Sequence, residues 1–152
     1  MKYIGVLLAV SDLERSKHFY QELFDQTVTL DLGWNVTFSG GFIIQLNFDQ
    51  LTNIPKDQII TKPNNMELYF EVDDFDAFVE NLRVYPGIEY VNEPMECDWK
   101  QRIVRIYDPD DHIIEIGESM QIIAKRYLAK GYSVEETAAL IQHPVDFVKT
   151  WL

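Results

Sequence analysis

Apolar and polar residues alternate along several short stretches of the chain, which predicts half-buried β-strands. In ELYFEV, residues 67–72, every second side chain is apolar, so Glu67 and Tyr69 share the opposite face. In HIIEIGE, residues 112–118, Glu115 points away from the isoleucines on either side of it. The apolar face of each strand must be covered by another element, so we expect the polar face to line a cavity.

Two segments have helical rather than alternating spacing, and they resemble each other. VSDLERSKHFYQEL, residues 10–23, aligns with VDDFDAFVENLRVY, residues 72–85, and Asp12 meets Asp74 in this alignment. From Phe75 onward, apolar residues recur at i, i+3, i+4 and i+7, which predicts an amphipathic helix with one buried face. The chain is therefore expected to contain a duplicated strand-helix unit.

Capping signals stand at the start of both predicted helices. Ser11 and Glu14 form an S-x-x-E capping box, and Asp73 with Asp76 fits the equivalent cap and first-turn positions.

Each helix is followed by three predicted strands. They cover residues 27–31, 34–39 and 42–49 in the first half and 88–93, 101–107 and 112–117 in the second. The turns SGG (39–41) and DPDD (108–111) separate the last two strands of each half. The predicted fold class is therefore α+β, with two β-α-β-β-β modules at residues 1–52 and 64–118, joined by a polar linker.

The segment 119–152 exceeds what the two modules need and predicts a helical C-terminal extension. A helix ends near Gly131, a second S-x-x-E box stands at Ser133 to Glu136, and Pro144 suits the first turn of a third helix. The pattern is similar to a helix-turn-helix fragment, but it has few basic residues. We favour the interpretation that its apolar face covers a sheet edge or a subunit interface.

Composition limits the possible partners. The chain has 152 residues, 47% of them hydrophobic, which is enough for one domain with a sizeable core. Thirteen Lys and Arg stand against 25 Asp and Glu, a net charge of −12 that disfavours nucleic acid and anionic membranes. No apolar run is long enough to span a bilayer. The only cysteine, Cys97, cannot form an intramolecular disulfide, so we expect a cytoplasmic protein and an inert thiol.

The two modules, a V-x-D at each helix start and the DPD-x-x-IIEI stretch at residues 108–116 together resemble the vicinal oxygen chelate superfamily. This superfamily includes glyoxalase I, bleomycin-resistance proteins and extradiol dioxygenases, and the resemblance covers about residues 1–118. It implies two curved sheets whose concave faces form a cavity for a small molecule, with the helices outside. A homodimer is also an expectation from the resemblance.

The resemblance further implies four cavity-facing ligand positions, which here are Gly5, Gln45, Glu67 and Glu115. Glyoxalase-type enzymes use His, Gln and Glu there, whereas Gly5 has no side chain and none of the three histidines fits. One alternative is a divalent cation such as Mg²⁺, Mn²⁺ or Ni²⁺ on the remaining oxygen ligands. The favoured alternative is that Arg105 pairs with one of the glutamates.

Six residues are candidates for direct contact with a small-molecule ligand. They are Trp34, Asn47, Tyr69, Trp99, Arg102 and Arg105. Each also has a structural interpretation, because aromatic side chains on strands are more often core and Trp99 could pack against the C-terminal extension.

Three classes of function stay open. The favoured one is a pocket that binds a small molecule without catalysis, as bleomycin-resistance proteins do. The second is a metal-dependent lyase or isomerase resembling glyoxalase I, in which Glu67 or Glu115 transfers the proton. The third is an interaction protein that acts through its helical extension.

Overall fold

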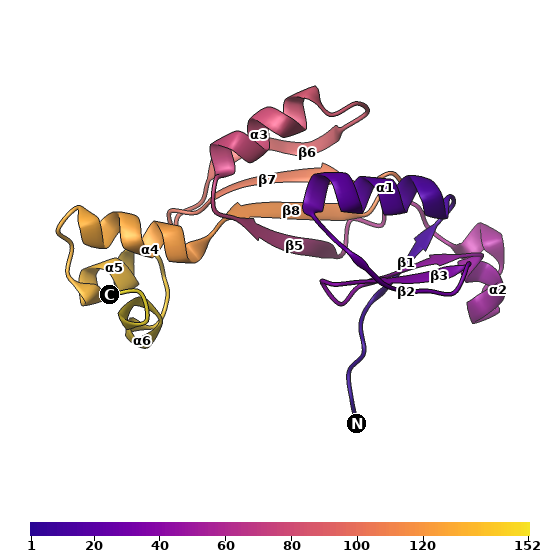
Figure 1. Cartoon of the computed structure of the whole chain (residues 1–152), viewed down its shortest axis with the longest axis horizontal. Helices are drawn as coiled ribbons and strands as arrows, with labels where there is room; N and C mark the ends of the chain where they lie inside the picture. Colours follow the sequence, from indigo (N-terminus) through magenta and orange to yellow (C-terminus); the bar gives the residue numbers. More distant parts are fainter. The chain divides into compact units, whose positions relative to one another are not determined.

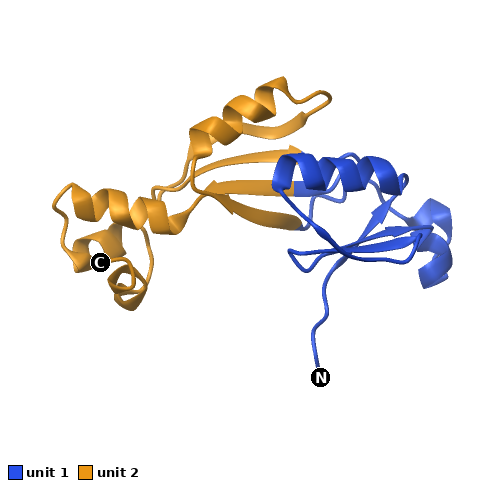
Figure 2. Ribbon diagram, in the orientation of Figure 1, with its two compact units in different colours: residues 1–66, 107–113 blue, residues 67–106, 114–152 orange.

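The computed structural model describes residues 1–152, which separate into two compact units (Figures 1 and 2). Unit 1 comprises residues 1–66 and 107–113, and unit 2 comprises residues 67–106 and 114–152. None of the helices combines the length and the apolar character that crossing a membrane requires.

Unit 1 contains a four-stranded sheet and one long helix (Figure 1). Its elements are β1 (Leu7–Val10), α1 (Leu13–Phe24), β2 (Val28–Asp31), β3 (Asn35–Phe38), β4 (Ile43–Leu46), α2 (Phe48–Thr52) and the 3-10 helix η1 (Lys56–Gln58). The strand order is β1-β4-β3-β2, with β1 parallel to β4 and the other pairs antiparallel. Leu8 and Val36 are both in register with Ile44, and all three are buried, so the apolar faces of the strands coincide.

Aromatic rings form much of the core of unit 1. The ring of Tyr20 on α1 lies 4.8 Å from that of Phe42 and 5.5 Å from that of Phe38, and Phe19 lies 5.2 Å from Tyr20. All four side chains are buried. Because each buried ring contributes roughly 2 kcal/mol, this cluster holds α1 firmly on the sheet.

The N-terminus of α1 differs from the sequence prediction. Asp12 is the N-cap, and its carboxylate accepts a hydrogen bond from the backbone N–H of Arg15 at 3.0 Å. Ser11 instead donates its hydroxyl to Asp110 at 2.6 Å. The predicted capping box of Ser11 and Glu14 is wrong, because Asp12 is an equally good cap and Ser11 is held by a tertiary contact.

Unit 2 repeats the element order of unit 1 and adds three helices. Its elements are β5 (Glu67–Val72), α3 (Phe75–Val84), β6 (Glu89–Glu96), β7 (Arg102–Tyr107), β8 (Ile113–Glu118), α4 (Met120–Ala129), α5 (Val134–Leu140) and α6 (Val145–Lys149). The strand order β5-β8-β7-β6 corresponds strand by strand to that of unit 1. The predicted α+β class with two β-α-β-β-β modules is confirmed.

Three predicted boundaries are wrong for local reasons. Strand β4 ends at Leu46 rather than residue 49, because Asn47 takes a left-handed conformation (φ 52°) that starts α2. Strand β6 continues through Pro94 to Glu96, which is tolerated because β6 is an edge strand and needs no N–H there. The cap of α3 is Asp74, which accepts from Ala77 N, and not Asp73.

The C-terminal helices have a small core of their own. It consists of Met120, Ile123, Ala124, Ala138, Ile141 and Val148. Trp99, from the turn between β6 and β7, packs against this core together with Trp151. The predicted capping box at α5 is confirmed, since Ser133 and Glu136 each accept the other's backbone N–H.

The DPDD turn between β7 and β8 is built around a buried carboxylate. Asp108 accepts from the hydroxyl of Tyr20 at 2.7 Å and from the backbone N–H groups of Asp110 and His112 at 2.9 and 2.8 Å. Its Oδ2 also lies 2.9 Å from Nδ1 of His112. This turn is therefore a structural element fixed on α1, as the contact of Asp110 with Ser11 also indicates.

The Asp108–His112 pair predicts a pH-dependent stability. Burial acts to lower the pKa of His112, but the carboxylate of Asp108, with smaller contributions from Asp110 and Asp111, outweighs it and raises this pKa above 6.5. The stabilisation is therefore complete below about pH 6.5 and is lost as the pH rises through the folded-state pKa. We expect the free energy of unfolding to fall by about 1 kcal/mol over this range. Urea unfolding at several pH values measures it, and the decrease should vanish in His112→Gln but persist in His18→Gln.

Candidate functional site

The face of the second sheet that α3 does not cover carries two glutamates and one arginine. Arg105 on β7 donates from Nε to Glu67 Oε2 on β5 at 2.9 Å, and its Nη2 forms an ion pair with Glu115 Oε2 on β8. Glu115 is only 7% exposed, whereas Glu67 is exposed. Burial raises the pKa of Glu115 above 4.5, Arg105 opposes the shift and Glu67 adds to it. One guanidinium thus contacts both carboxylates.

A chain of hydrogen bonds fixes Tyr69 on β5. The indole N–H of Trp99 donates to Gln101 Oε1 at 2.8 Å, and Gln101 Nε2 donates to the hydroxyl oxygen of Tyr69 at 2.6 Å. That hydroxyl donates to Glu71 Oε1 at 2.8 Å. Burial raises the pKa of Tyr69. A Cβ at Gly117 would run into the Gln101 amide, so this glycine makes room for the chain. No sequence motif marks Gln101, so its part in this chain of hydrogen bonds became evident only from the structure.

A pocket of about 340 Å³ lies on unit 1, between the turn after β2 and the start of α2. Its lining residues are Trp34, Gln45, Leu46, Asn47, Gln50 and Leu51. The side chain of Trp34 is 60% exposed, so its ring face is open to a ligand. No lining side chain is charged, and three of them end in an amide. The pocket brings together Trp34 and Asn47, which the sequence marks as ligand contacts, with Gln45.

The amide of Gln45 is held by neighbouring groups of unit 1. Its Oε1 accepts from Asn35 Nδ2 at 2.7 Å, and its Nε2 donates to the carbonyl of Leu46 at 2.6 Å. The residue is 3% exposed. Gln45 is thus oriented by the protein itself and forms the floor of the pocket rather than an open ligand.

The residues present do not fit the metal site that the family resemblance implies. Both Glu67 and Glu115 are engaged by Arg105, and Gln45 is engaged by backbone and side-chain partners. At Gly5 a Cβ would run into the carbonyl of Gly41, so the backbone itself excludes a side chain at the first position. No cluster of three His, Cys, Asp or Glu residues has a geometry that could hold a metal ion.

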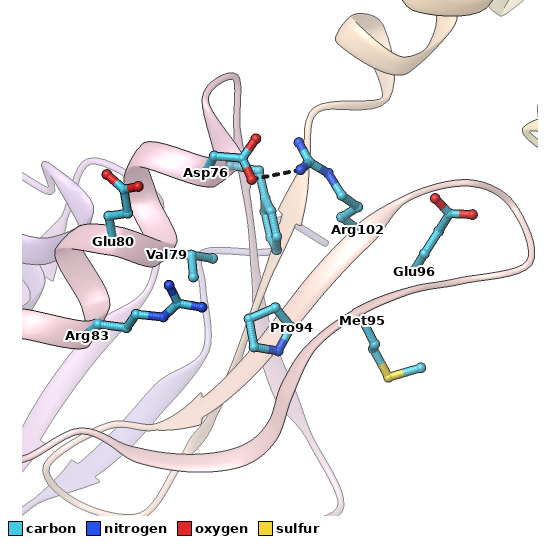
Figure 3. A pocket seen from close by; sticks show the side chains of 9 residues that line it. Asp76, Val79, Glu80, Arg83, Pro94, Met95, Glu96 and Arg102 are labelled. Atoms are coloured by element: carbon cyan, nitrogen blue, oxygen red, sulfur yellow. Dashed lines mark hydrogen bonds and ion pairs between the residues drawn. The ribbon is translucent and has the colours of Figure 1, made fainter.

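Arg102 and Trp99, two of the candidate ligand contacts, have partners other than Glu67 and Glu115. Arg102 lies on the opposite side of β7 from Arg105, because the two positions are three residues apart along a strand whose side chains alternate in direction. It donates to Asp76 on α3 at 2.8 Å (Figure 3) and to both oxygens of Glu118. Trp99 packs against the core of the C-terminal helices. Arg102 therefore serves the α3 side of the sheet, whereas Trp99 is joined through Gln101 to Tyr69 on the face that carries Arg105.

The model of the glyoxalase-like domain matches residues 3–121. The chain belongs to this family. The predicted membership in the vicinal oxygen chelate superfamily is thereby confirmed. The match ends just after the start of α4, so most of the C-terminal helical extension of this glyoxalase-like protein lies beyond the matched region.

Several solved structures match the fold of this chain. A protein of unknown function from Agrobacterium tumefaciens is 34% identical, with 78% of this chain and 94% of that chain covered and a TM-score of 0.67. A glyoxalase-related enzyme from Fulvimarina pelagi is 21% identical (78% and 89% covered, TM-score 0.63). A fosfomycin resistance protein from Mesorhizobium loti is 20% identical (78% and 92% covered, TM-score 0.56). The latter two show the fold and not the activity.

Proposed function

We propose that this glyoxalase-like protein binds a small, uncharged or cationic ring compound and does so without a metal ion. The observation that carries the proposal is the pocket beside Trp34, which combines an open indole face with amide side chains and no charge. An indole face attracts flat rings and cations, and amides form hydrogen bonds with neutral polar groups. The net charge of −12 acts against anionic ligands at an uncharged pocket.

The ion pairs of Arg105 with Glu67 and Glu115, here called the Arg105 cluster, support the proposal that no metal ion is needed. A metal-dependent lyase or isomerase would need Glu67 or Glu115 as a free ligand or proton-transferring base. Here both carboxylates form an ion pair with Arg105, which supplies a positive charge at this place without a metal ion. A fosfomycin resistance protein shares this fold, which is compatible with a small-molecule ligand.

The ligand class is tested with three flat probes of different charge. Nicotinamide (uncharged) and benzamidine (cationic) should bind beside Trp34 with a Kd on the order of 1 mM, since a ligand with few atoms has little binding free energy left after the cost of association. Trp34→Ala should weaken the binding of both probes by about tenfold, which is the effect expected from the loss of a stacking contact. Amide chemical shifts of Asn47 and Gln50 report the site, and benzoate should leave them unchanged.

A matched control for this test is Tyr3→Ala, which removes another exposed aromatic ring of unit 1. It should bind both probes as the unaltered protein does. Equal affinity in Trp34→Ala, or probe binding that requires added divalent metal, would contradict the proposed function.

A further inference from the structure

We propose that a second site, the groove between α3 and the edge strand β6, binds a small organic carboxylate. The groove holds about 280 Å³ and is lined by Phe75, Asp76, Val79, Glu80, Arg83, Pro94, Met95, Glu96 and Arg102. It lies on the side of the second sheet that α3 covers, away from Tyr69 and Arg105. Figure 3 shows its floor at Val79 and Pro94, with a guanidinium toward either end.

Arg83 is the group that points to an anion. Every other arginine of the chain contacts a carboxylate: Arg15 pairs with Asp110, Arg102 and Arg126 with Glu118, and Arg105 with Glu67 and Glu115. Arg83 has no such partner, although the chain has almost twice as many acidic as basic residues. Its side chain extends across the groove toward Pro94 rather than along α3 toward Glu80 (Figure 3).

Two of the three carboxylates of the groove, Asp76 and Glu96, already have a cationic partner. Asp76 accepts from Arg102 at 2.8 Å, and Glu96 lies 3.6 Å from Lys100. Arg102 also stacks over the ring of Phe75, with 5.1 Å between guanidinium carbon and ring centroid. Arg83 is therefore the guanidinium of the groove that has no carboxylate partner, and Glu80 is the unpaired carboxylate that opposes an anion there.

The apolar floor of the groove indicates the chemistry of the part of the ligand that does not contact Arg83. Val79 and Pro94 offer an apolar floor beside the Arg83 guanidinium, so a carboxylate can bind the arginine while its ring or branched chain lies on the floor. A carboxylate also matches the planar fork of the guanidinium in geometry. The ligand class is thus an aromatic or branched aliphatic carboxylate, whereas the ligand proposed for the Trp34 pocket is uncharged or cationic.

Benzoate and benzamide, which share a shape but differ in charge, test the site. Titration of ¹⁵N-labelled protein with benzoate should shift the amide signals of Val79, Arg83 and Met95. Arg83→Gln should weaken benzoate binding by about tenfold, since it removes the charge-assisted pair. Glu80→Gln should tighten it by a few fold, because the opposing carboxylate is removed. Lys56→Gln, which removes a positive charge from unit 1, should leave the affinity unchanged.

Several results would overturn the assignment of this groove. They are equal binding of benzamide and benzoate, benzoate binding that survives Arg83→Gln, shifts confined to residues outside the groove, and no benzoate binding at all. Trp34→Ala should not alter benzoate binding, so this proposal and the proposed function fail independently. Thermal unfolding of each variant without ligand verifies that Arg83→Gln and Glu80→Gln are folded.

Discussion

Glu118→Gln should lower the free energy of unfolding by about 3 kcal/mol, because it leaves two arginines without their buried partner. Glu118 is 1% exposed at the end of β8 and accepts from Arg102 Nε and Nη2 at 3.1 and 3.0 Å. Arg126 on α4 contacts the same carboxylate. The carboxylate therefore links the sheet to the C-terminal helices.

The pH dependence of this loss has a definite sign. Burial acts to raise the pKa of Glu118, but Arg102 and Arg126 outweigh it, so the folded-state pKa lies below 4.5. The stabilisation is present above about pH 4.5 and is lost as the pH falls through the folded-state pKa. Urea unfolding at a series of pH values from 7 downward should show the largest difference between the two proteins at pH 7 and a shrinking difference as the pH falls through the folded-state pKa.

A matched control for Glu118→Gln is Glu135→Gln, an exposed acid in the first turn of α5. This substitution should lower the free energy of unfolding by at most about 0.5 kcal/mol, the size of a helix-dipole contact. Hydrogen exchange should show that Glu118→Gln loses protection first in α4, where Arg126 is released. A loss no larger than that of the control would contradict the role of Glu118 as the link.

Arg105→Met should lower the free energy of unfolding by about 2 kcal/mol, since Glu115 would be left buried without its counter-charge. The pair with Glu67 adds little, because that carboxylate is exposed. Glu115 already has a raised pKa, and without Arg105 it should rise further. The loss should therefore be largest at neutral pH and shrink as acid protonates Glu115.

The double variant Arg105→Met, Glu115→Gln separates this cause from lost packing. It should recover most of the stability, because no charge is then buried. Arg83→Met is the matched control, as it removes an arginine without a carboxylate partner and should change stability by less than about 0.5 kcal/mol. Equal losses in Arg105→Met and in the double variant would contradict a buried pair at Glu115.

Local patterns were sufficient to predict the duplicated fold and the faces of its strands. Strand parity puts Glu67, Tyr69 and Glu115 on one side of the second sheet, and the structure has them there. The two-residue period of a strand is local, so no knowledge of the tertiary fold is needed for it. The cap of α1 was missed by one residue, since Ser11 is recruited by Asp110 from a distant turn.

The arrangement of the site required the strand order as well. In the order β5-β8-β7, the strand of Glu115 lies between those of Glu67 and Arg105, so a single guanidinium reaches both carboxylates. Nothing in the sequence reports that Gly5 lies against the carbonyl of Gly41. Such contacts depend on packing between segments far apart in the chain.

Arg105, and not a metal ion, is proposed to be the positively charged group that pairs with Glu67 and Glu115. Thermal unfolding of protein purified without chelator, titrated with Mn²⁺, Ni²⁺ and Mg²⁺, tests it most directly, because a ligand of the native state raises the melting temperature. We expect no metal to raise the Tm of the unaltered protein. A rise with one of these metals that disappears in Glu67→Ala and Glu115→Ala would contradict the account.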